Sequence, residues 1–163
     1  SGIGDRASLT RAERETLRWT PVVGVVQEVA PAVVFVQSER PYQAFGLRGQ
    51  HRVTTGSGVV IEESGYIVTN FHVVGNDGRI SVQFDPDVDK TTYGARLVSY
   101  SEPDDLALLK IEASRPLAVV RRGTSAELWI GENVVALGHP FQQELSVSTG
   151  IGSRPTWAAR SYR

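Results

Sequence analysis

The sequence of 163 residues contains neither cysteine nor methionine. Because there is no thiol, a disulfide scaffold and a thiolate metal site are both excluded. No apolar run reaches the length of about 18 residues that a membrane-spanning helix needs, so we predict no transmembrane segment. The histidines also lack a metal-ligand spacing such as His-x-x-x-His. We therefore predict no metal and no cofactor.

A strong charge of one sign is missing as well. Lysine and arginine number 17, aspartate and glutamate number 18, and the formal net charge is −1. A balanced chain offers no field that could hold a nucleic-acid backbone or an anionic membrane. We predict no nucleic-acid partner. A local patch of Arg115, Arg121 and Arg122 is the one place left where a polyanion could bind. The 40% of hydrophobic residues is sufficient for the core of one ordinary domain.

The first 31 residues have a helical pattern. Residues 10–13 (TRAE) fit a capping box and predict a short helix that runs to about Trp19. Thr20 and Pro21 then fit the N-cap and first position of a second helix. Residues 30–31 (AP) end it, so we predict a short N-terminal helical arm.

From Ala32 onward the pattern changes to that of β-strands. Residues 63–65 (ESG) form the turn of a predicted hairpin, and residues 40–52 are predicted as a long loop. Short strands without intervening helices favour an all-β protein, either an antiparallel barrel or a sandwich. The predicted strands are residues 33–38, 58–62, 66–69, 80–84, 91–100, 106–111, 133–137 and 145–151.

His72 is the histidine best placed for chemistry. In residues 65–74 (GYIVTNFHVV) an apolar strand, predicted at residues 66–69, leads into a turn that carries His72, and His72 has apolar neighbours on both sides. Such packing fixes a rotamer, which a catalytic base requires, although a packed, hydrogen-bonded histidine would fit the same position. His51 is predicted to be a surface residue, and His139, in a turn before Pro140, a structural one.

Asp105 is the carboxylate expected to accompany His72. It stands directly before the apolar residues 106–109 (LALL), closer to the strand than Asp104. A carboxylate there would be desolvated unless a histidine donates to it. The pair would then supply a general base and the group that orients it.

Ser57 is an alternative candidate because it lies in the glycine-rich residues 54–58 (TTGSG). These glycines lead into a strand and not a helix, so neither a nucleophile elbow nor a phosphate loop fits. We predict that Ser57 is packed or hydrogen-bonded at the start of a strand and is not a nucleophile.

Several of these segments, in this order and spacing, resemble the trypsin-like serine proteases and more closely their HtrA/Deg group. They are residues 21–38, 56–61, 65–74, 105–110, 131–141 and 148–151. The resemblance implies two antiparallel β-barrels with the active site between them, and a triad in the order His, Asp, Ser. His72 resembles the general base and Asp105 the residue that orients it. It also implies a helical arm (residues 1–31), a first barrel (residues 32–143) and the opening of a second (residues 144–163).

The sequence departs from the family in important places. The family's nucleophile lies in a Gly-Asn-Ser-Gly-Gly turn of the second barrel, and this sequence contains no such turn and no PDZ domain. His139 replaces the more usual asparagine before proline. We therefore expect the N-terminal part of a serine endopeptidase, inactive by itself. The alternative is a non-catalytic binding or assembly module that uses the barrel surface, the arm and the open edge of the strand at residues 145–151.

The resemblance also carries expectations about partners and place. It implies unfolded or misfolded polypeptides as substrates, a homo-oligomer of the trimeric kind usual in the family, and a location in the cell envelope or periplasm or outside the cell. Residues 40–52 correspond to a loop that takes part in oligomer contacts or regulation in HtrA proteins.

Overall fold

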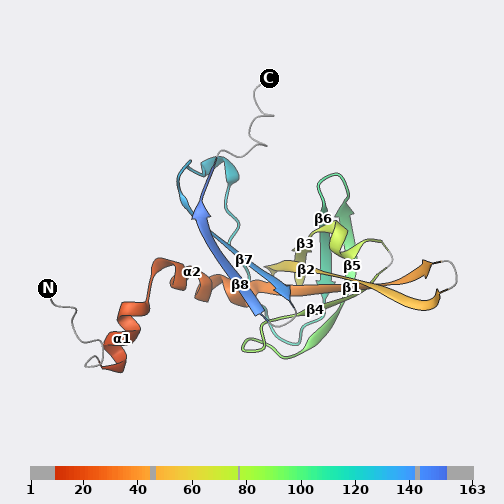
Figure 1. The fold of residues 1–163 in the computed structure, drawn as a ribbon, viewed down its shortest axis with the longest axis horizontal. Coiled ribbons are helices and arrows are strands. Elements are labelled where there is room, and N and C mark those ends of the chain that lie inside the picture. The colour runs from red at the N-terminus through yellow and green to blue at the C-terminus, as the bar shows by residue number, and fades with distance from the viewer. Residues whose placement is uncertain (1–9, 45–46, 77, 142–143, 154–163) are drawn as a thin grey trace, which may run out of the picture.

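The computed structural model describes residues 10–44, 47–76, 78–141 and 144–153, which form an arm of helices, a barrel and a separate hairpin (Figure 1). The arm contains α1 (Arg11–Arg18), α2 (Pro21–Val29) and the 3-10 turn η2 (Ala30–Ala32). Thr10 and Glu13 form the predicted capping box, and Thr20 caps α2 with Pro21 in its first turn. No helix in this part of the chain is long and apolar enough to cross a membrane.

Six antiparallel strands close into a barrel, which confirms the predicted all-β fold. Each strand pairs with two neighbours in the order β1-β2-β3-β6-β5-β4. The closed order pairs β3 with β6 and β1 with β4, although these strands are far apart in the sequence. The strands are β1 (Val33–Ala44), β2 (Leu47–Glu62), β3 (Tyr66–Thr69), β4 (Arg79–Gln83), β5 (Thr92–Ser101) and β6 (Leu106–Ile111).

The barrel interior is filled by side chains that alternate along the strands. On β6, Leu109 and Ile111 are fully buried, whereas Leu106 at the strand start is 48% exposed. Gly58 faces the same interior, where an added Cβ would lie 2.9 Å from the side chains of Ile67 and Val36. The alternation follows from the period of two along a strand, and the glycine leaves room for its larger neighbours.

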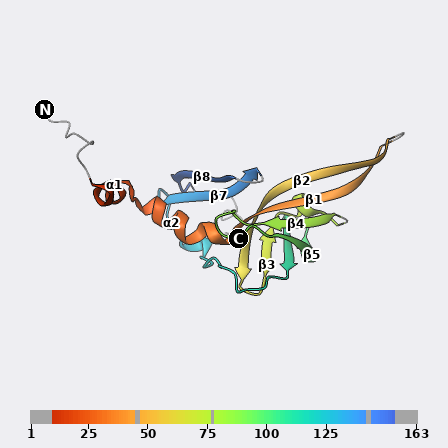
Figure 2. The ribbon, with the colours of Figure 1, turned by 90° about the horizontal axis from the view of Figure 1, so that it is seen from below.

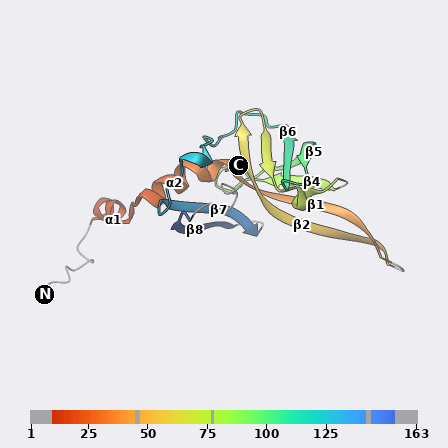
Figure 3. The ribbon, with the colours of Figure 1, turned by 90° about the horizontal axis from the view of Figure 1, so that it is seen from above.

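The loop predicted for residues 40–52 is wrong. β1 and β2 continue as a paired hairpin, in which Arg40 is opposite Arg52 and Pro41 is opposite His51. The hairpin projects well beyond the barrel (Figure 3). Pro41, His51 and Arg52 are exposed, so this segment does not need the apolar alternation by which half-buried strands are recognised.

The remaining strands form a separate two-stranded sheet. β7 (Asn133–Phe141) pairs antiparallel with β8 (Glu144–Ile151), after a single 3-10 turn, η3 (Ser125–Glu127), in the described residues. Figure 2 shows this sheet running alongside α2 and next to the barrel. The predicted boundary between residues 143 and 144 falls between these two strands, whereas the sheets themselves divide before β7.

Leu109→Ala tests the barrel core. Leu109 is fully buried, so we expect the substitution to lower the free energy of unfolding by about 2–5 kcal/mol. Leu106→Ala on the same strand is the control and should cost less than about 1 kcal/mol. Urea denaturation followed by circular dichroism measures both, and equal losses would contradict the observed alternation.

Candidate active site

His72 lies on a helix of one turn, α3 (Phe71–Val74), directly after β3. Its neighbours Val73 and Val74 are buried, which turns the His72 side chain outward with 67% of its surface exposed. The sequence predicted a turn at this point, and the helix was missed because four residues are too few to show a helical period. Two apolar anchors therefore fix the direction in which the imidazole points.

Asp105 lies in the turn between β5 and β6 with φ at 51°, a left-handed conformation that is uncommon for residues other than glycine. Its amide donates to the carbonyl of Glu102 at 3.1 Å. Its own carbonyl accepts from the amide of Phe71 at 3.2 Å and from Asn70 Nδ2 at 3.1 Å. The unusual conformation thus attaches the turn to the start of α3.

The carboxylate of Asp105 holds His72 at two points. Asp105 Oδ2 is 2.7 Å from His72 Nδ1, and Asp105 Oδ1 accepts from the His72 amide at 2.8 Å. Asn70 Nδ2 also donates to Oδ2, at 3.2 Å. With Nδ1 donating to the carboxylate, the lone pair is on Nε2, which is the arrangement a general base requires.

The structure therefore brings together the two residues that the sequence singled out, and their catalytic roles remain a prediction. The expected burial of the carboxylate is wrong, because the Asp105 side chain is 43% exposed. Its side-chain hydrogen-bond partners among the described residues are His72 and Asn70, which both lie at the start of α3. Asn70 is a site residue that sequence analysis missed; its place between a strand and the histidine was the available signal.

Hydrogen bonding lowers the pKa of Asp105 below its usual value. The largest cause is the bond from the His72 amide, followed by the bond from the His72 side chain, with Asn70 contributing least. Donors that favour the charged carboxylate make it harder to protonate. The carboxylate of this His72–Asp105 pair, the dyad, therefore stays ionised more readily than that of an ordinary aspartate.

The glycine-rich segment has a structural role in this fold. Ser57 lies within β2, where its Oγ accepts from the His139 amide at 2.8 Å and its carbonyl accepts from Thr69 Oγ1 at 2.8 Å. At Gly56, an added Cβ would lie 2.5 Å from Cγ2 of Val73 on α3. The prediction that Ser57 is a hydrogen-bonded strand residue agrees with these contacts, although it lies in the middle of the strand.

The other two histidines are separate from the dyad. His51 is exposed on the β1–β2 hairpin. His139 is only 1% exposed, and burial lowers its pKa, which favours the neutral ring. Within the described ranges no group of three or more potential metal ligands comes together.

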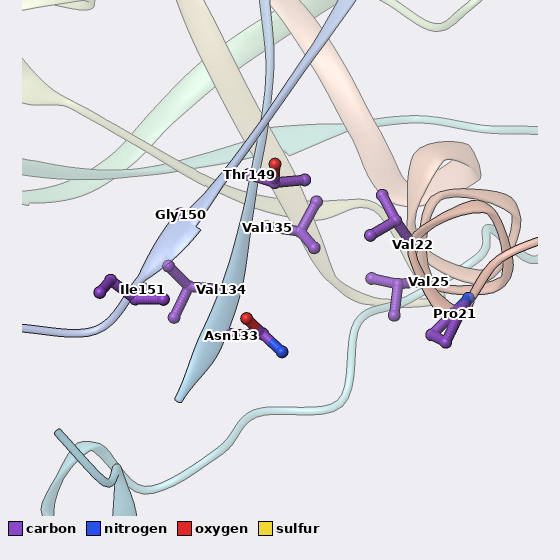
Figure 4. Close-up of a pocket in the computed structure, with 9 residues that line it drawn as sticks. All are labelled: Pro21, Val22, Val25, Asn133, Val134, Val135, Thr149, Gly150 and Ile151. Carbon is purple, nitrogen blue, oxygen red and sulfur yellow. The ribbon is translucent and has the colours of Figure 1, made fainter. Parts of the chain in front are cut away.

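Two hollows adjoin the β7–β8 sheet. An open one of about 350 Å³ lies between the barrel and β7, and its lining includes Asn70, Ser57 and Leu106. A larger one of about 710 Å³ lies between α2 and the sheet and is lined mainly by apolar side chains (Figure 4). The smaller hollow borders the dyad, since Asn70 binds Asp105 and Leu106 follows it.

Comparison with known proteins assigns the family. The model of the trypsin-like peptidase domain matches residues 56–158, which is more than half of the chain. The chain belongs to the trypsin-like peptidase family. Its relatives are HtrA and DegP serine proteases, which confirms the predicted group.

Three relatives show the extent of this similarity. Serine protease HTRA1B of Danio rerio is 41% identical over 136 residues, covering 83% of this trypsin-like chain and 27% of that protein. Serine protease HTRA4 of Mus musculus is 37% identical over 153 residues, covering 93% and 30%. A probable periplasmic serine endoprotease DegP-like of Hahella chejuensis is 42% identical over 113 residues, covering 69% and 23%. The chain thus spans about a quarter of the length of the relatives it matches.

Titration of Asp105 in this trypsin-like chain tests the two-point contact. Because the largest cause of the lowered pKa is the His72 amide, His72→Ala should raise the pKa only partly and leave it below the ordinary value of about 3.9. Asn70→Ala, which removes the weakest of these donors, should change it less. Carboxyl ¹³C NMR across pH 2 to 6, an interval of about two units either side of that ordinary value, measures all three proteins.

The lowered pKa of Asp105 also makes the stability of the fold depend on pH. A carboxylate with a lowered folded pKa stabilises the fold above its unfolded pKa, and this contribution is lost as the pH falls through the folded value. A pKa in His72→Ala at or above that of a free aspartate would show that the amide contact does not hold the carboxylate.

Proposed function

We propose that this chain supplies the general base and its orienting carboxylate to a serine endopeptidase of HtrA/Deg type. The observation that supports this most directly is the two-point contact between His72 and Asp105, with 2.7 Å between Nδ1 and Oδ2. The pair belongs to a chain of the trypsin-like peptidase family, in which such a contact fits the first two members of a triad.

The proposed mechanism uses Nε2 of His72 as the proton acceptor. A serine contributed from outside the described residues attacks the peptide carbonyl, and its hydroxyl proton passes to Nε2. The imidazolium then donates that proton to the leaving amine, while the ionised Asp105 stabilises its charge and keeps Nδ1 as a donor. The hollow lined by Asn70, Ser57 and Leu106 adjoins sequence neighbours of the two residues, although neither His72 nor Asp105 lines it.

The wider biology follows from the relatives and is part of the same proposal. We propose unfolded or misfolded polypeptides as substrates, assembly as a homo-oligomer, a trimer by family resemblance, and a place in the cell envelope or outside the cell. The name of the Hahella relative, a probable periplasmic endoprotease, supports the proposed place. The division into arm, first barrel and opening of a second barrel is also proposed, with the boundary before β7.

Removing the base tests the proposal in a protein that joins this chain to the family's serine turn. His72→Ala should lower kcat/KM for casein by roughly 10³-fold or more, because the serine is then not activated. Arg96→Ala, an exposed change on β5, is the control and should retain activity. A His72→Ala enzyme with unchanged turnover would refute the assignment of the base.

The chain of 163 residues should itself be inactive. We expect no casein cleavage and no specific labelling of any serine by a fluorophosphonate probe, since the base has no nucleophile to activate. Ser57 is the serine to check by mass spectrometry, because it lies in the glycine-rich segment; its Oγ accepts a hydrogen bond from the backbone amide of His139. Specific labelling at Ser57 would overturn both its structural role and the proposed location of the nucleophile.

A non-catalytic binding module is the second candidate. Within the described residues β8 pairs with β7 alone, so one edge of this sheet presents unpaired backbone groups. Such an edge can accept an extended polypeptide as an added strand. A reading frame that continues into a Gly-x-Ser-Gly-Gly motif favours the protease, whereas a stop codon directly after residue 163 favours the module.

A further inference from the structure

The helix that carries His72 cannot satisfy its own carbonyl groups. An α-helix leaves the carbonyls of its last four residues without partners inside the helix, and α3 has only four residues. One of them is accounted for locally, because the amide of Gly75 donates to the carbonyl of Phe71 at 2.8 Å. The carbonyls of His72, Val73 and Val74 need donors from elsewhere.

Strand β1 supplies donors to all three carbonyls from two side chains. Arg40 Nη2 lies 3.4 Å from the carbonyl oxygens of both His72 and Val73. Ser38 Oγ donates to the carbonyl of Val74 at 3.0 Å. Ser38 and Arg40 are two residues apart on one strand, so their side chains extend on the same face and reach the same end of α3.

Two glycines leave the space that these donors occupy. An added Cβ on Gly75 would overlap the guanidinium of Arg40, and one on Gly78 would overlap Ser38 Oγ. Gly75 also has φ at +57° as it ends the helix, a conformation that other residues adopt at a cost. The Ser38 side chain is fully buried, so its bond to Val74 is made away from competing water.

The opposite end of α3 is held by Asp105, through the amides of Phe71 and His72. The helix is therefore fixed between β1 and the β5–β6 turn, and a shift at one end changes the distances at the other. We propose that Arg40 and Ser38 are positioning residues for His72, which set the rotation of α3 at which its amide and imidazole both meet the Asp105 carboxylate. An effect of Arg40 and Ser38 on catalysis rests on the proposed function of His72 as the base. Their effect on the position of α3 does not rest on it.

The geometric part is tested on this chain without any activity assay. Arg40→Met removes the donor to two carbonyls and keeps an unbranched side chain. We expect the His72 and Gly75 amides to exchange with deuterium about tenfold faster, as for the loss of one or two hydrogen bonds. The pKa of Asp105 should rise at the same time, because its main donor is the His72 amide.

Arg96→Met is the matched control, since Arg96 is an exposed arginine of the same barrel on β5. It should leave the amide exchange of α3 and the Asp105 titration unchanged. Arg40→Lys keeps the charge with a single donor group and should give intermediate values. Ser38→Ala should accelerate deuterium exchange of the Gly75 amide more than that of amides in the barrel strands.

A purely structural role would give a different pattern. If Arg40→Met accelerated exchange evenly across the barrel and left the Asp105 titration unchanged, the positioning role would be refuted. If Arg40→Met fails to fold, the same criteria apply to Arg40→Lys and Ser38→Ala, which change less.

The catalytic part is tested in the protein that includes the family's serine turn. There Arg40→Met should lower kcat about tenfold or more with little change in KM, because the arginine would act through the base and not through substrate binding. If His72→Ala leaves activity intact, the proposed function fails while the exchange and titration results still decide the positioning role. A loss expressed only in KM would overturn positioning as the cause.

Discussion

The whole site depends on a helix that is too short to be stable by itself. A single turn fixes several residues for very few hydrogen bonds, so α3 exists only because the surrounding structure satisfies both of its ends. Its partners are 32 to 36 residues away in the sequence, at Ser38 and Arg40 on one side and Asp105 on the other. The barrel supplies this proximity, because β3 pairs with β6 and the helix that follows β3 contacts both β1 and β6.

Exposure decides how the dyad achieves its geometry. Both side chains are more than 40% exposed, so an ion pair between them would be weakened by the surrounding water. The dyad therefore depends on directed hydrogen bonds, with the Asp105 carboxylate receiving an amide and a ring nitrogen of the same residue. For a base to be effective in proteolysis, water must be excluded by groups outside the described residues, such as a bound substrate or further strands.

Much of the fold could be predicted from local signals, whereas His72 and Asp105 were singled out by the order and spacing of the segments around them. The capping box at Thr10, the β-branched strands and the segments around His72 and Asp105 each have a distinct pattern. The β1–β2 hairpin could not be predicted, since residues 40–52 lack the apolar alternation of a half-buried strand and pair only with each other beyond the barrel. The contacts of Ser38 and Arg40 were equally inaccessible, because they appear only when the fold brings distant segments together.

The Gly-Ser-Gly segment shows why a short motif is weak evidence for chemistry by itself. Gly56 accommodates Val73 of α3, Gly58 leaves room for the barrel core, and Ser57 accepts a hydrogen bond from β7 through the His139 amide. Three consecutive residues thus connect the histidine helix, the barrel interior and the second sheet. The bond from the His139 amide is therefore one of the contacts by which the β7–β8 sheet lies against β1 and β2.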